Sequence, residues 1–261
     1  MQKPALSAVL ITRNAERTIG KCLAGLEFAD EIVVLDTNST DLTVAIARER
    51  GARVFRSPLK GFGPTKNAAV GKARGKWILS IDADEFVPPG LKKEIKRVID
   101  SPNPLDAYEI PRRNFYFGKW LRFGGKYPDL QCRLFRKGRA GFTPKHLHEG
   151  VRARGRTGRL WHHLDHDAYP TLDEYVRKLK FYSSYEALHL LSSGARPSWP
   201  LALSLCFARP LSRFVRRYFL KAGFLDGLPG FLACVHDAMT HILTYAYLAE
   251  AAERRRRKGA G

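Results

Sequence analysis

Over the first hundred residues, short apolar runs alternate with longer segments that carry apolar residues at helical spacing. The apolar runs are rich in β-branched residues and too short for helices, so they predict strands. They occupy residues 6–12, 31–37, 53–57 and 76–82. The segments between them predict helices at about 15–28, 41–50 and 64–74. Strands that alternate with helices are typical of an open, mostly parallel α/β sheet with helices on both faces.

The alternation stops near residue 105. The stretches AYEIPRRNFYF (107–117) and LQCRLFRKG (130–138) predict two strands without a helix between them, so we expect the sheet to be mixed in this part. YPTLDEYVRKLKFYSSYEALHLL (169–191) predicts a helix, and a Gly-, Ser- and Pro-rich stretch at 192–200 predicts a boundary.

These patterns predict one large α/β domain followed by a helical tail. The domain covers residues 1–191, with halves of about 1–104 and 105–191, and the tail covers 192–261. The length of 261 residues is enough to bury a sizeable core. Because ligands bind beyond the carboxyl ends of strands in such sheets, we expect the site there.

The charge of the chain is strongly positive. It has 45 Lys and Arg against 25 Asp and Glu, a formal net charge of +20, while 44% hydrophobic residues indicate a globular protein. Such a charge predicts a polyanionic partner, which could be nucleic acid, an anionic membrane surface or a phosphorylated small molecule. Composition does not choose among these three.

The cysteines and the apolar segments bear on the cellular compartment. The four cysteines are scattered without a C-x-x-C pair, so neither a structural zinc site nor a disulfide framework is expected. No leader-like segment precedes the first strand, and no uncharged apolar run reaches about 18 residues. We therefore expect a protein that faces the cytosol.

The stretch ILSIDADEF (78–86) places Asp82, Asp84 and Glu85 directly after a buried strand. Three carboxylates this close repel one another unless a cation neutralises them. Oxygen ligands suit Mg²⁺ or Mn²⁺, which are commonly held by one or two carboxylates together with the phosphates of a substrate. The structural alternative is that Asp84 or Glu85 favours the positive start of a helix opened by Pro88 and Pro89.

Two further polar clusters follow the first two strands. TRNAE contains Thr12 and Asn14, and DTNSTDLT begins at Asp36. Asp36 is placed to accept hydrogen bonds from a ribose hydroxyl or a base N–H, whereas Asn14 and the backbone near Thr12 could contact a base edge. Loop chemistry is the alternative, and we favour it for Thr37 and Asn38. In LKGFGPTKN (59–67), Lys66 near a helix N-terminus could meet a phosphate.

At this point the chain resembles a known family. The stretches SAVLITRNAERTIGKCL, ADEIVVLDTNSTDLTVAIA, KGFGPTKNAAV and WILSIDADEFV are similar to the family 2 inverting glycosyltransferases, which have the GT-A fold. The closest resemblance is to the branch of bacterial lipopolysaccharide-core β-glycosyltransferases, and it continues through YPDLQCRLFRKG, HLHEGV, RLWHHLDHDAYPTLDEYVRKLKFYS and FVRRYFLKAGFLDGLPGF. Two departures, Ala15 where an acid is common and DTNST where serine and glycine are common, leave the donor contacts open.

The resemblance implies an activity and its partners. It implies metal-dependent transfer, with inversion, of a hexose such as glucose from a nucleotide diphosphate donor, a UDP-sugar, to a phosphorylated, lipid-linked saccharide such as the lipopolysaccharide inner core. It assigns a divalent cation, Mg²⁺ or Mn²⁺, to Asp82, Asp84 and His166. Together with the residues singled out above, the expected donor-binding set is Thr12, Asn14, Glu16, Asp36, Lys66, Asp82 and Arg133.

The general base is expected in KHLHEG (145–150). Inverting transfer needs a carboxylate or imidazole within reach of the acceptor hydroxyl. Glu149 is the first choice with His148 beside it, and Asp129 in YPDLQ is the second choice or a turn residue. Structural roles are expected for His162 and His163. Arg133 and Arg136 could hold the donor diphosphate or an acceptor phosphate, and for Arg136 a solvated strand face is the alternative.

The tail contains LSRFVRRYFLK (211–221), with Leu211, Phe214, Val215, Tyr218 and Phe219 at helical spacing and arginines on the other face. A basic helix with an aromatic, apolar face is typical of a membrane interface. Packing on the body of the protein is the alternative. We expect a basic amphipathic appendage that holds the protein on the inner face of the bacterial inner membrane, at an anionic membrane surface.

Two other functions remain as alternatives. A nucleotidyltransferase shares the sheet and the metal, but it usually has a glycine-rich loop after the first strand, and TRNAERT contains no glycine. A nucleic-acid-binding protein is suggested only by charge, because we find neither zinc-ligand spacing nor an RNA-recognition motif. We therefore expect no nucleic acid among the partners.

Overall fold

The computed structural model describes residues 5–143 and 150–259. A ten-stranded mixed sheet dominates, accompanied by a two-stranded hairpin. The strands are β1 (Leu6–Thr12), β2 (Glu31–Asp36), β3 (Arg53–Arg56), β4 (Trp77–Ser80), β5 (Glu85–Phe86), β6 (Ala107–Tyr116), β7 (Lys119–Trp120), β8 (Asp129–Arg136), β9 (Ala140–Phe142), β10 (Val151–Ala153), β11 (Thr157–Arg159) and β12 (Leu164–Tyr169).

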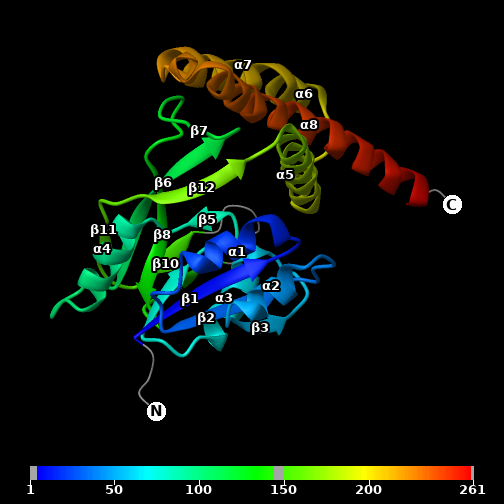
Figure 1. Ribbon diagram of the computed structural model, residues 1–261. Coiled ribbons are helices and arrows are strands. Elements are labelled where there is room, and N and C mark those ends of the chain that lie inside the picture. Colours follow the sequence, from blue (N-terminus) through cyan, green and yellow to red (C-terminus); the bar gives the residue numbers. More distant parts are fainter. Residues whose placement is uncertain (1–4, 144–149, 260–261) are drawn as a thin grey trace. The chain divides into compact units, whose positions relative to one another are not determined.

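The helices cover the first half in alternation with the strands and form most of the last third of the chain (Figure 1). The helical segments are α1 (Glu16–Ala24), α2 (Thr43–Glu49), α3 (Phe62–Lys72), α4 (Pro89–Ile99), α5 (Leu172–Ser192), α6 (Trp199–Leu203), the π-helix η1 (Ser204–Ala208), α7 (Arg209–Val215), the π-helix η2 (Arg216–Leu220), the 3₁₀-helix η3 (Gly223–Asp226) and α8 (Gly227–Gly259). The predicted strands and helices of the first hundred residues are present, with ends that differ by a few residues.

The sheet order is β3-β2-β1-β4-β8-β6-β12-β5. The first four strands of this order are parallel, with Thr12 opposite Asp36 at the carboxyl ends of β1 and β2. β8 is antiparallel to both β4 and β6, so the sheet becomes mixed where the helix–strand alternation stops, as the sequence predicts. The order reverses at β1, between β2 and β4, and this switch point is where open α/β sheets bind ligands.

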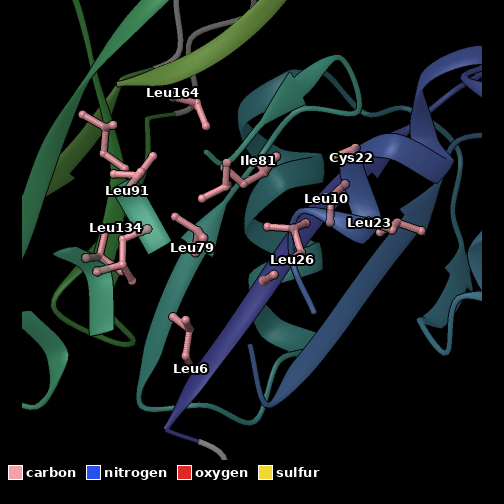
Figure 2. Close-up of a cluster of buried hydrophobic side chains, with 14 of the residues drawn as sticks. Leu6, Leu10, Cys22, Leu23, Leu26, Leu79, Ile81, Leu91, Leu134 and Leu164 are labelled. Atoms are coloured by element: carbon pink, nitrogen blue, oxygen red, sulfur yellow. The ribbon is translucent and has the colours of Figure 1, made fainter. Parts of the chain in front are cut away.

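Helices cover both faces of the parallel strands. One core cluster joins α1, α2 and α4 to one face, with Leu10, Leu79 and Leu91 fully buried among its members (Figure 2). A second cluster packs α3 on the other face through Ala69 and Val70. Successive strand residues point to opposite faces, so strands that are apolar at nearly every position are needed for two such cores.

Contacts between Cα atoms divide the described chain into two compact units. Unit 1 extends to Arg113 and resumes from Asp129 to His166; unit 2 holds Asn114–Pro128 and the chain from Asp167 onward. The sequence also predicts a functional boundary between residues 191 and 192. That boundary does not coincide with the division into compact units, and it stays a prediction.

Unit 2 has its own core. Tyr116, Leu121, Tyr169 and Tyr175 pack around Ala233 of α8, and the rings of Tyr116 and Tyr169 lie 4.5 Å apart between centroids. Asp237 of α8 forms ion pairs with Lys126 and Arg217 at 3.0 and 2.9 Å. The long helix α8 therefore joins the 114–128 segment to the helices that precede it within the same unit.

Candidate active site

Polar side chains of unit 1 gather at the switch point of the sheet. Thr12 ends β1, Asp36 ends β2, and Asp82 follows β4 by two residues. Because β1 lies between β2 and β4, the carboxyl ends of all three strands meet at one edge. The expected convergence of the three sequence clusters is therefore present.

Asp82 is held between two cations. Its Oδ1 lies 2.9 Å from Lys66 Nζ, and its Oδ2 accepts a hydrogen bond from Arg133 Nη2. Burial opposes ionisation, but Arg133 and Lys66 outweigh it and hold the pKa of Asp82 well below its usual range. Lys66 lies in α3 and is only 8% exposed in its side chain, so the helix that the loop 59–67 opens aims this cation at the acid cluster.

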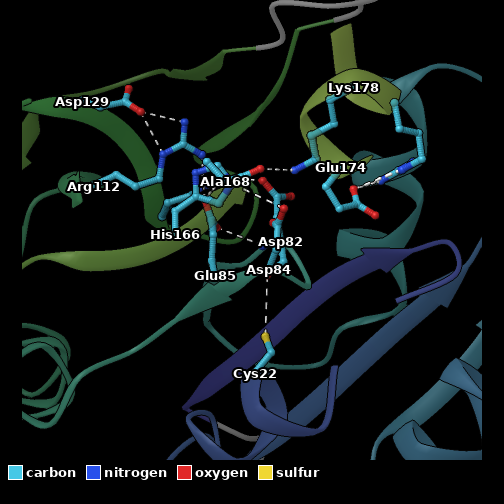
Figure 3. Close-up of polar contacts among 12 residues, drawn as sticks. Cys22, Asp82, Asp84, Glu85, Arg112, Asp129, His166, Ala168, Glu174 and Lys178 are labelled. Carbon is cyan, nitrogen blue, oxygen red and sulfur yellow. Dashed lines mark hydrogen bonds and ion pairs between the residues drawn. The ribbon is translucent and has the colours of Figure 1, made fainter. Parts of the chain in front are cut away.

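Glu85 is fully buried, and protein groups meet its charge. Its Oε1 accepts from Arg112 Nη1 at 2.9 Å and from Arg133 Nη2, and its Oε2 accepts from the backbone N–H of Asp82 at 2.9 Å (Figure 3). Burial lowers the pKa of Arg133, but Asp82 and Glu85 outweigh it, so that the pKa rises and the guanidinium stays charged. Glu85 thus fixes the turn after β4.

Asp84 and His166 form the partly exposed end of the cluster. Asp84 Oδ2 lies 3.4 Å from His166 Nε2, and the two side chains are 28% and 15% exposed. His166 is brought there because β12 pairs with β5, with His166 opposite Glu85. Among residues 5–143 and 150–259, no group of three His, Cys, Asp or Glu side chains could hold a metal ion by itself.

Asp129, at the start of β8, is tied to protein partners through both carboxylate oxygens. Arg112 donates from Nε and Nη2 to Oδ2 at 2.9 and 2.7 Å, and Gln131 Nε2 donates to Oδ1 at 2.7 Å. Arg112 therefore bridges Asp129 and Glu85. Burial opposes the charge of Arg112, but Glu85 and Asp129 outweigh it and raise its pKa.

Asp36 and Thr12 lie side by side at the strand ends. Thr12 Oγ1 donates to Asp36 Oδ1 at 3.4 Å, and the backbone N–H of Ser39 donates to Oδ2 at 3.0 Å. Asp36 is fully buried. Its position is fixed by the register of β1 and β2, which makes it a stiff element of the site.

Asn14 and Glu16 connect the loop after β1 to the loop after β2. Asn14 Oδ1 accepts from the N–H of Thr40 at 2.9 Å, and Glu16 Oε2 accepts from the N–H of Leu42 at 3.1 Å. Asn14 adopts a φ of 49°, a backbone region that asparagine tolerates better than most residues. Asn14 and Glu16 therefore hold the two loops together. The donor-binding role expected for them stays a prediction.

Three further predictions concern the second half of unit 1. Glu149 and His148 lie outside the described residues. His162 Nδ1 lies 2.9 Å from Glu94 Oε2, and that carboxylate also accepts from the N–H groups of Trp161 and His162. Arg136 Nη2 donates to the carbonyl of Pro104 at 3.1 Å.

Sequence reasoning did not single out Arg112. It lies in β6, in a stretch where the sequence shows only a general excess of basic residues. One signal was available: an arginine at a partly buried strand position needs a carboxylate partner, and two acids near strand ends, Glu85 and Asp129, were already known. The pairing of β6 with β8, which supplies the geometry, could not be read from the chain.

A sheet that begins in the order 3-2-1-4, continues in antiparallel strands and carries D-x-D after β4 is the architecture of GT-A glycosyltransferases. The chain belongs to glycosyl transferase family 2, whose sequence profile matches residues 7–153. The chain is thus a glycosyltransferase, and the nucleotidyltransferase alternative falls away.

Two relatives match nearly the whole chain. The lipopolysaccharide core biosynthesis glycosyltransferase LpsC of Rhizobium meliloti is 29% identical over 94% of this chain and 92% of that protein. An uncharacterized glycosyltransferase of Rickettsia typhi is 30% identical over 94% of this chain and 87% of that protein. The chain is therefore a homologue of a lipopolysaccharide core glycosyltransferase.

Among solved structures, residues 1–349 of TarS from S. aureus are similar, with 16% identity, 97% of this chain and 92% of that chain covered, and a TM-score of 0.46. Glucosyl-3-phosphoglycerate synthase from Mycobacterium tuberculosis, in complex with Mn²⁺, UDP and glucosyl-3-phosphoglycerate, is 25% identical, with 43% and 44% covered and a TM-score of 0.35.

Proposed function

We propose that this glycosyltransferase moves a hexose, such as glucose, from a UDP-sugar to a phosphorylated, lipid-linked saccharide, with inversion at the anomeric carbon and with the help of Mg²⁺ or Mn²⁺. The observation that carries the proposal is the charge arrangement after β4: Asp82 held between Lys66 and Arg133, with the Asp84–His166 pair beside it. A nucleotide diphosphate needs cations at its phosphates and a hydrogen-bond acceptor at its ribose or base. Asp36 at the same edge would be that acceptor once the donor displaces Thr12 or Ser39 from its oxygens.

Lys66 and Arg133 are the protein cations for the diphosphate. Both are nearly buried, with side chains 8% and 5% exposed, and both face Asp82. When the diphosphate enters, its oxygens compete with Asp82 for these two cations, so Asp82 becomes able to turn toward the donor or a cation. Arginine's planar fork and the position of Lys66 in α3 suit phosphate oxygens.

Asp84 and His166 are the residues that fit a divalent ion best. Asp84 Oδ2 and His166 Nε2 lie 3.4 Å apart, which is close enough for both atoms to reach one Mg²⁺ or Mn²⁺ ion. An O and N pair suits Mn²⁺ and, beside further oxygens, Mg²⁺. Such sites use few protein ligands, so Asp82 would be the third protein ligand, and donor phosphates and water would supply the others. When bound, the ion neutralises the charge that develops on the departing diphosphate.

The transfer itself is a single displacement. The acceptor oxygen attacks the anomeric carbon on the face opposite the diphosphate, the bond between that carbon and the phosphate oxygen breaks, and the nucleoside diphosphate leaves with the electron pair. The hydroxyl proton passes to a carboxylate, for which we propose Glu149. Asp129 is the second candidate, but its two oxygens already accept from Arg112 and Gln131, which favours a positioning role.

Two observations support a phosphorylated, lipid-linked saccharide as the acceptor. LpsC, by its name, takes part in lipopolysaccharide core biosynthesis, and phosphorylated saccharides on a lipid match the basic character of residues 110–160. An enzyme with such an acceptor works at an anionic membrane surface. We therefore propose a peripheral location on the inner face of the bacterial inner membrane.

The test replaces Asp84 by asparagine, which removes the charge and keeps the shape. We expect sugar transfer to fall at least about 100-fold, and Mn²⁺-dependent binding of UDP, measured by calorimetry, to weaken at least about ten-fold, because one ion ligand loses its charge. Asp100→Asn, an exposed acid at the end of α4, is the matched control and should change neither. Full activity and unchanged UDP binding in Asp84→Asn would overturn the metal assignment.

A further inference from the structure

Unit 2 carries a row of large apolar side chains that its own helices leave exposed. Trp199, Leu203, Phe207, Leu211, Val215 and Phe219, here called the apolar row, follow α6, η1, α7 and η2 at intervals of four residues. They are between 38% and 78% exposed. Scattered exposed leucines need no explanation, but a contiguous row of this length does.

The two π-helices keep the row on one face. In an α-helix each residue turns by about 100°, so a four-residue repeat drifts by about 40° per step and about 200° over the twenty residues from Trp199 to Phe219. A π-turn holds about one residue more than an α-turn, so each π segment removes about 100° of drift. The chain has two such segments, η1 and η2, and together they cancel the drift.

The helices α6, η1, α7 and η2 (Trp199–Leu220) are here called the helical rod. Other side chains of this rod are packed inside unit 2. Leu205 and Pro210 are buried, and Phe214 stacks on Tyr218 at 5.1 Å between ring centroids. Both of these rings contact Phe231 of α8. The apolar face expected from the sequence is therefore divided: Phe214 and Tyr218 pack inward, whereas Leu211, Val215 and Phe219 face outward.

A second exposed group continues the row past the end of η2. Leu220, Phe224, Leu225 and Leu228, here called the apolar tip, are between 47% and 78% exposed. They lie on η2, η3 and the start of α8, which is the segment where the chain turns back along α8 (Figure 1). Row and tip follow one another along the chain within unit 2, and together they are here called the apolar surface.

The surroundings of this surface are cationic. Between Glu186 and Asp237 the one acid is Asp226, which is 3% exposed and accepts from the N–H of Phe123. Arg209, Arg216 and Lys221 are exposed beside the row. At the tip, Leu225 lines an open cavity of about 460 Å³ together with Lys119 and Arg122.

We propose that the apolar row and the apolar tip lie in the boundary between headgroups and acyl chains of an anionic phospholipid bilayer, with the flanking cations at the lipid phosphates. Apolar and aromatic side chains on one face and basic residues at its edges are what an interfacial helix needs. This deepens the proposed function, because it identifies the surface that brings the enzyme to a lipid-linked acceptor.

The chemistry favours the surface of a bilayer over a second copy of the chain and over a membrane-spanning arrangement. A second copy of the chain would bring its own Arg209, Arg216 and Lys221 against the same cations, which is unfavourable. In the part of the chain that the structure describes, no single helix is long and apolar enough to span a membrane; only Trp199–Leu220 and Gly223–Arg257, bent by 72°, meet that requirement as a pair. Because Leu205, Phe214 and Tyr218 of the same helices are packed within unit 2, the rod lies in the interface and does not cross the bilayer.

The first experiment measures co-sedimentation with vesicles of phosphatidylcholine and phosphatidylglycerol. One variant, here called the row variant, combines Phe207→Ser, Leu211→Ser and Phe219→Ser. Its partition coefficient into the vesicles should be lower at least about ten-fold, because three large apolar side chains that would move from water into the lipid are removed. The matched control combines Leu172→Ser, Val176→Ser and Leu188→Ser on α5, which are 60%, 54% and 56% exposed, and should bind as the unmodified chain does. Equal binding of the row variant and the unmodified chain would overturn the proposal.

The second experiment tests the position of the row. Lipids brominated in their acyl chains should quench the tryptophan fluorescence of the unmodified chain and of Trp161→Phe, and should quench that of Trp199→Phe much less, since only Trp120 then remains near the apolar tip. Trp161 is 79% exposed and lies in unit 1, so it is the matched control. Quenching that persists in Trp199→Phe and disappears in Trp161→Phe would place the contact elsewhere and refute the inference.

The remaining outcomes separate this inference from the proposed function. Retention in the membrane after alkaline carbonate extraction would indicate a span and contradict an interfacial position. A dimer in the absence of lipid, lost in the row variant and without vesicle binding, would assign the surface to a second copy. Hydrolysis of UDP-glucose in detergent-free solution, with Mn²⁺, should be equal in the row variant and the unmodified chain; its absence in both would count against the proposed function only.

Discussion

Three acids that adjoin in the sequence have different surroundings. Glu85 is buried against Arg112 and Arg133, Asp82 is held between Lys66 and Arg133, and Asp84 faces His166 at the partly exposed end. The sequence predicts the acid cluster and its place at a strand end, because D-x-D and the strand before it are local signals. It does not predict which acid is buried, because that depends on β6, β8 and β12, which come later in the chain.

The two base candidates can be separated by charge-removing variants. Glu149→Gln should lower kcat at least about 100-fold and leave the Kd for UDP within about two-fold, because a general base acts on the acceptor proton. Asp129→Asn should lower kcat less and should reduce thermal stability, because Arg112 loses a buried ion-pair partner. Kinetics and thermal unfolding of both variants check this. A larger loss of kcat in Asp129→Asn, without loss of stability, would exchange the two assignments.

At the scale of elements, Glu31 joins three strands of the parallel sheet. It starts β2, accepts from Ser7 Oγ of β1 at 2.6 Å, and pairs with Arg53 of β3 and with Arg74. The strands themselves could be predicted, because their apolar runs are local patterns. The π-helices could not be predicted from the sequence. Their signal is an apolar repeat of four residues, and this repeat indicates π-turns only once the packed side of the rod is known.

Glu31 makes the parallel sheet sensitive to acid. Burial raises its pKa, but hydrogen bonds from Ser7, Arg74 and Arg53 outweigh it and lower the pKa from 4.5 to about 2. The carboxylate thus contributes stability above pH 4.5, of about 3 kcal/mol, that is lost as the pH falls from 4.5 toward 2. Glu31→Gln should lower the free energy of unfolding at pH 7 by about this amount and reduce the pH dependence in that range, to which Asp82 and Glu94, also with lowered pKa values, still contribute. Urea titrations at several pH values measure both; an unchanged pH dependence would contradict the assignment.

For the whole molecule, the sequence predicts an α/β domain of GT-A type with a helical appendage, and the fold class is confirmed. The composition of the compact units was not predictable. Asn114–Pro128 belongs to unit 2 because Lys126 pairs with Asp237 of α8, more than a hundred residues later. A contact over that separation leaves no periodic signal in the chain.

The two units should differ in their response to mild acid. In unit 2, burial and then Lys126 and Lys178 lower the pKa of His236 to about 4, against the opposite influence of Asp237. The unfolded chain binds a proton near pH 6.5, so this histidine contributes stability above that pH, about 3 kcal/mol, that is lost as the pH falls from 6.5 to 4. Unit 2 should therefore weaken before unit 1, whose Glu31 still holds its charge.

The matched variant for unit 2 is His236→Gln. In the unmodified chain the Tyr169 hydroxyl lies 3.2 Å from His236 Nε2. Glutamine keeps a polar partner for this hydroxyl but has no group that titrates. The stability of the variant should decline less between pH 6.5 and 4 than that of the unmodified chain, because His163 and His241, whose pKa values are also lowered by burial, remain. Thermal unfolding followed by tyrosine absorbance checks this. The same decline in both proteins would mean that another group is responsible.

The two π-helices have a consequence for how the helical rod tolerates changes in length. Loss of one residue within 204–208 would convert η1 to an ordinary α-turn, and every side chain beyond it would swing by about 100° around the rod. Leu211, Val215 and Phe219 would then leave the line set by Trp199, and Phe214 would lose its neighbour Phe231. A deletion here therefore rotates the remainder of the rod. Homologues that keep the apolar row should gain or lose residues in η1 and η2 only in combinations that return the later side chains to the same angle around the rod.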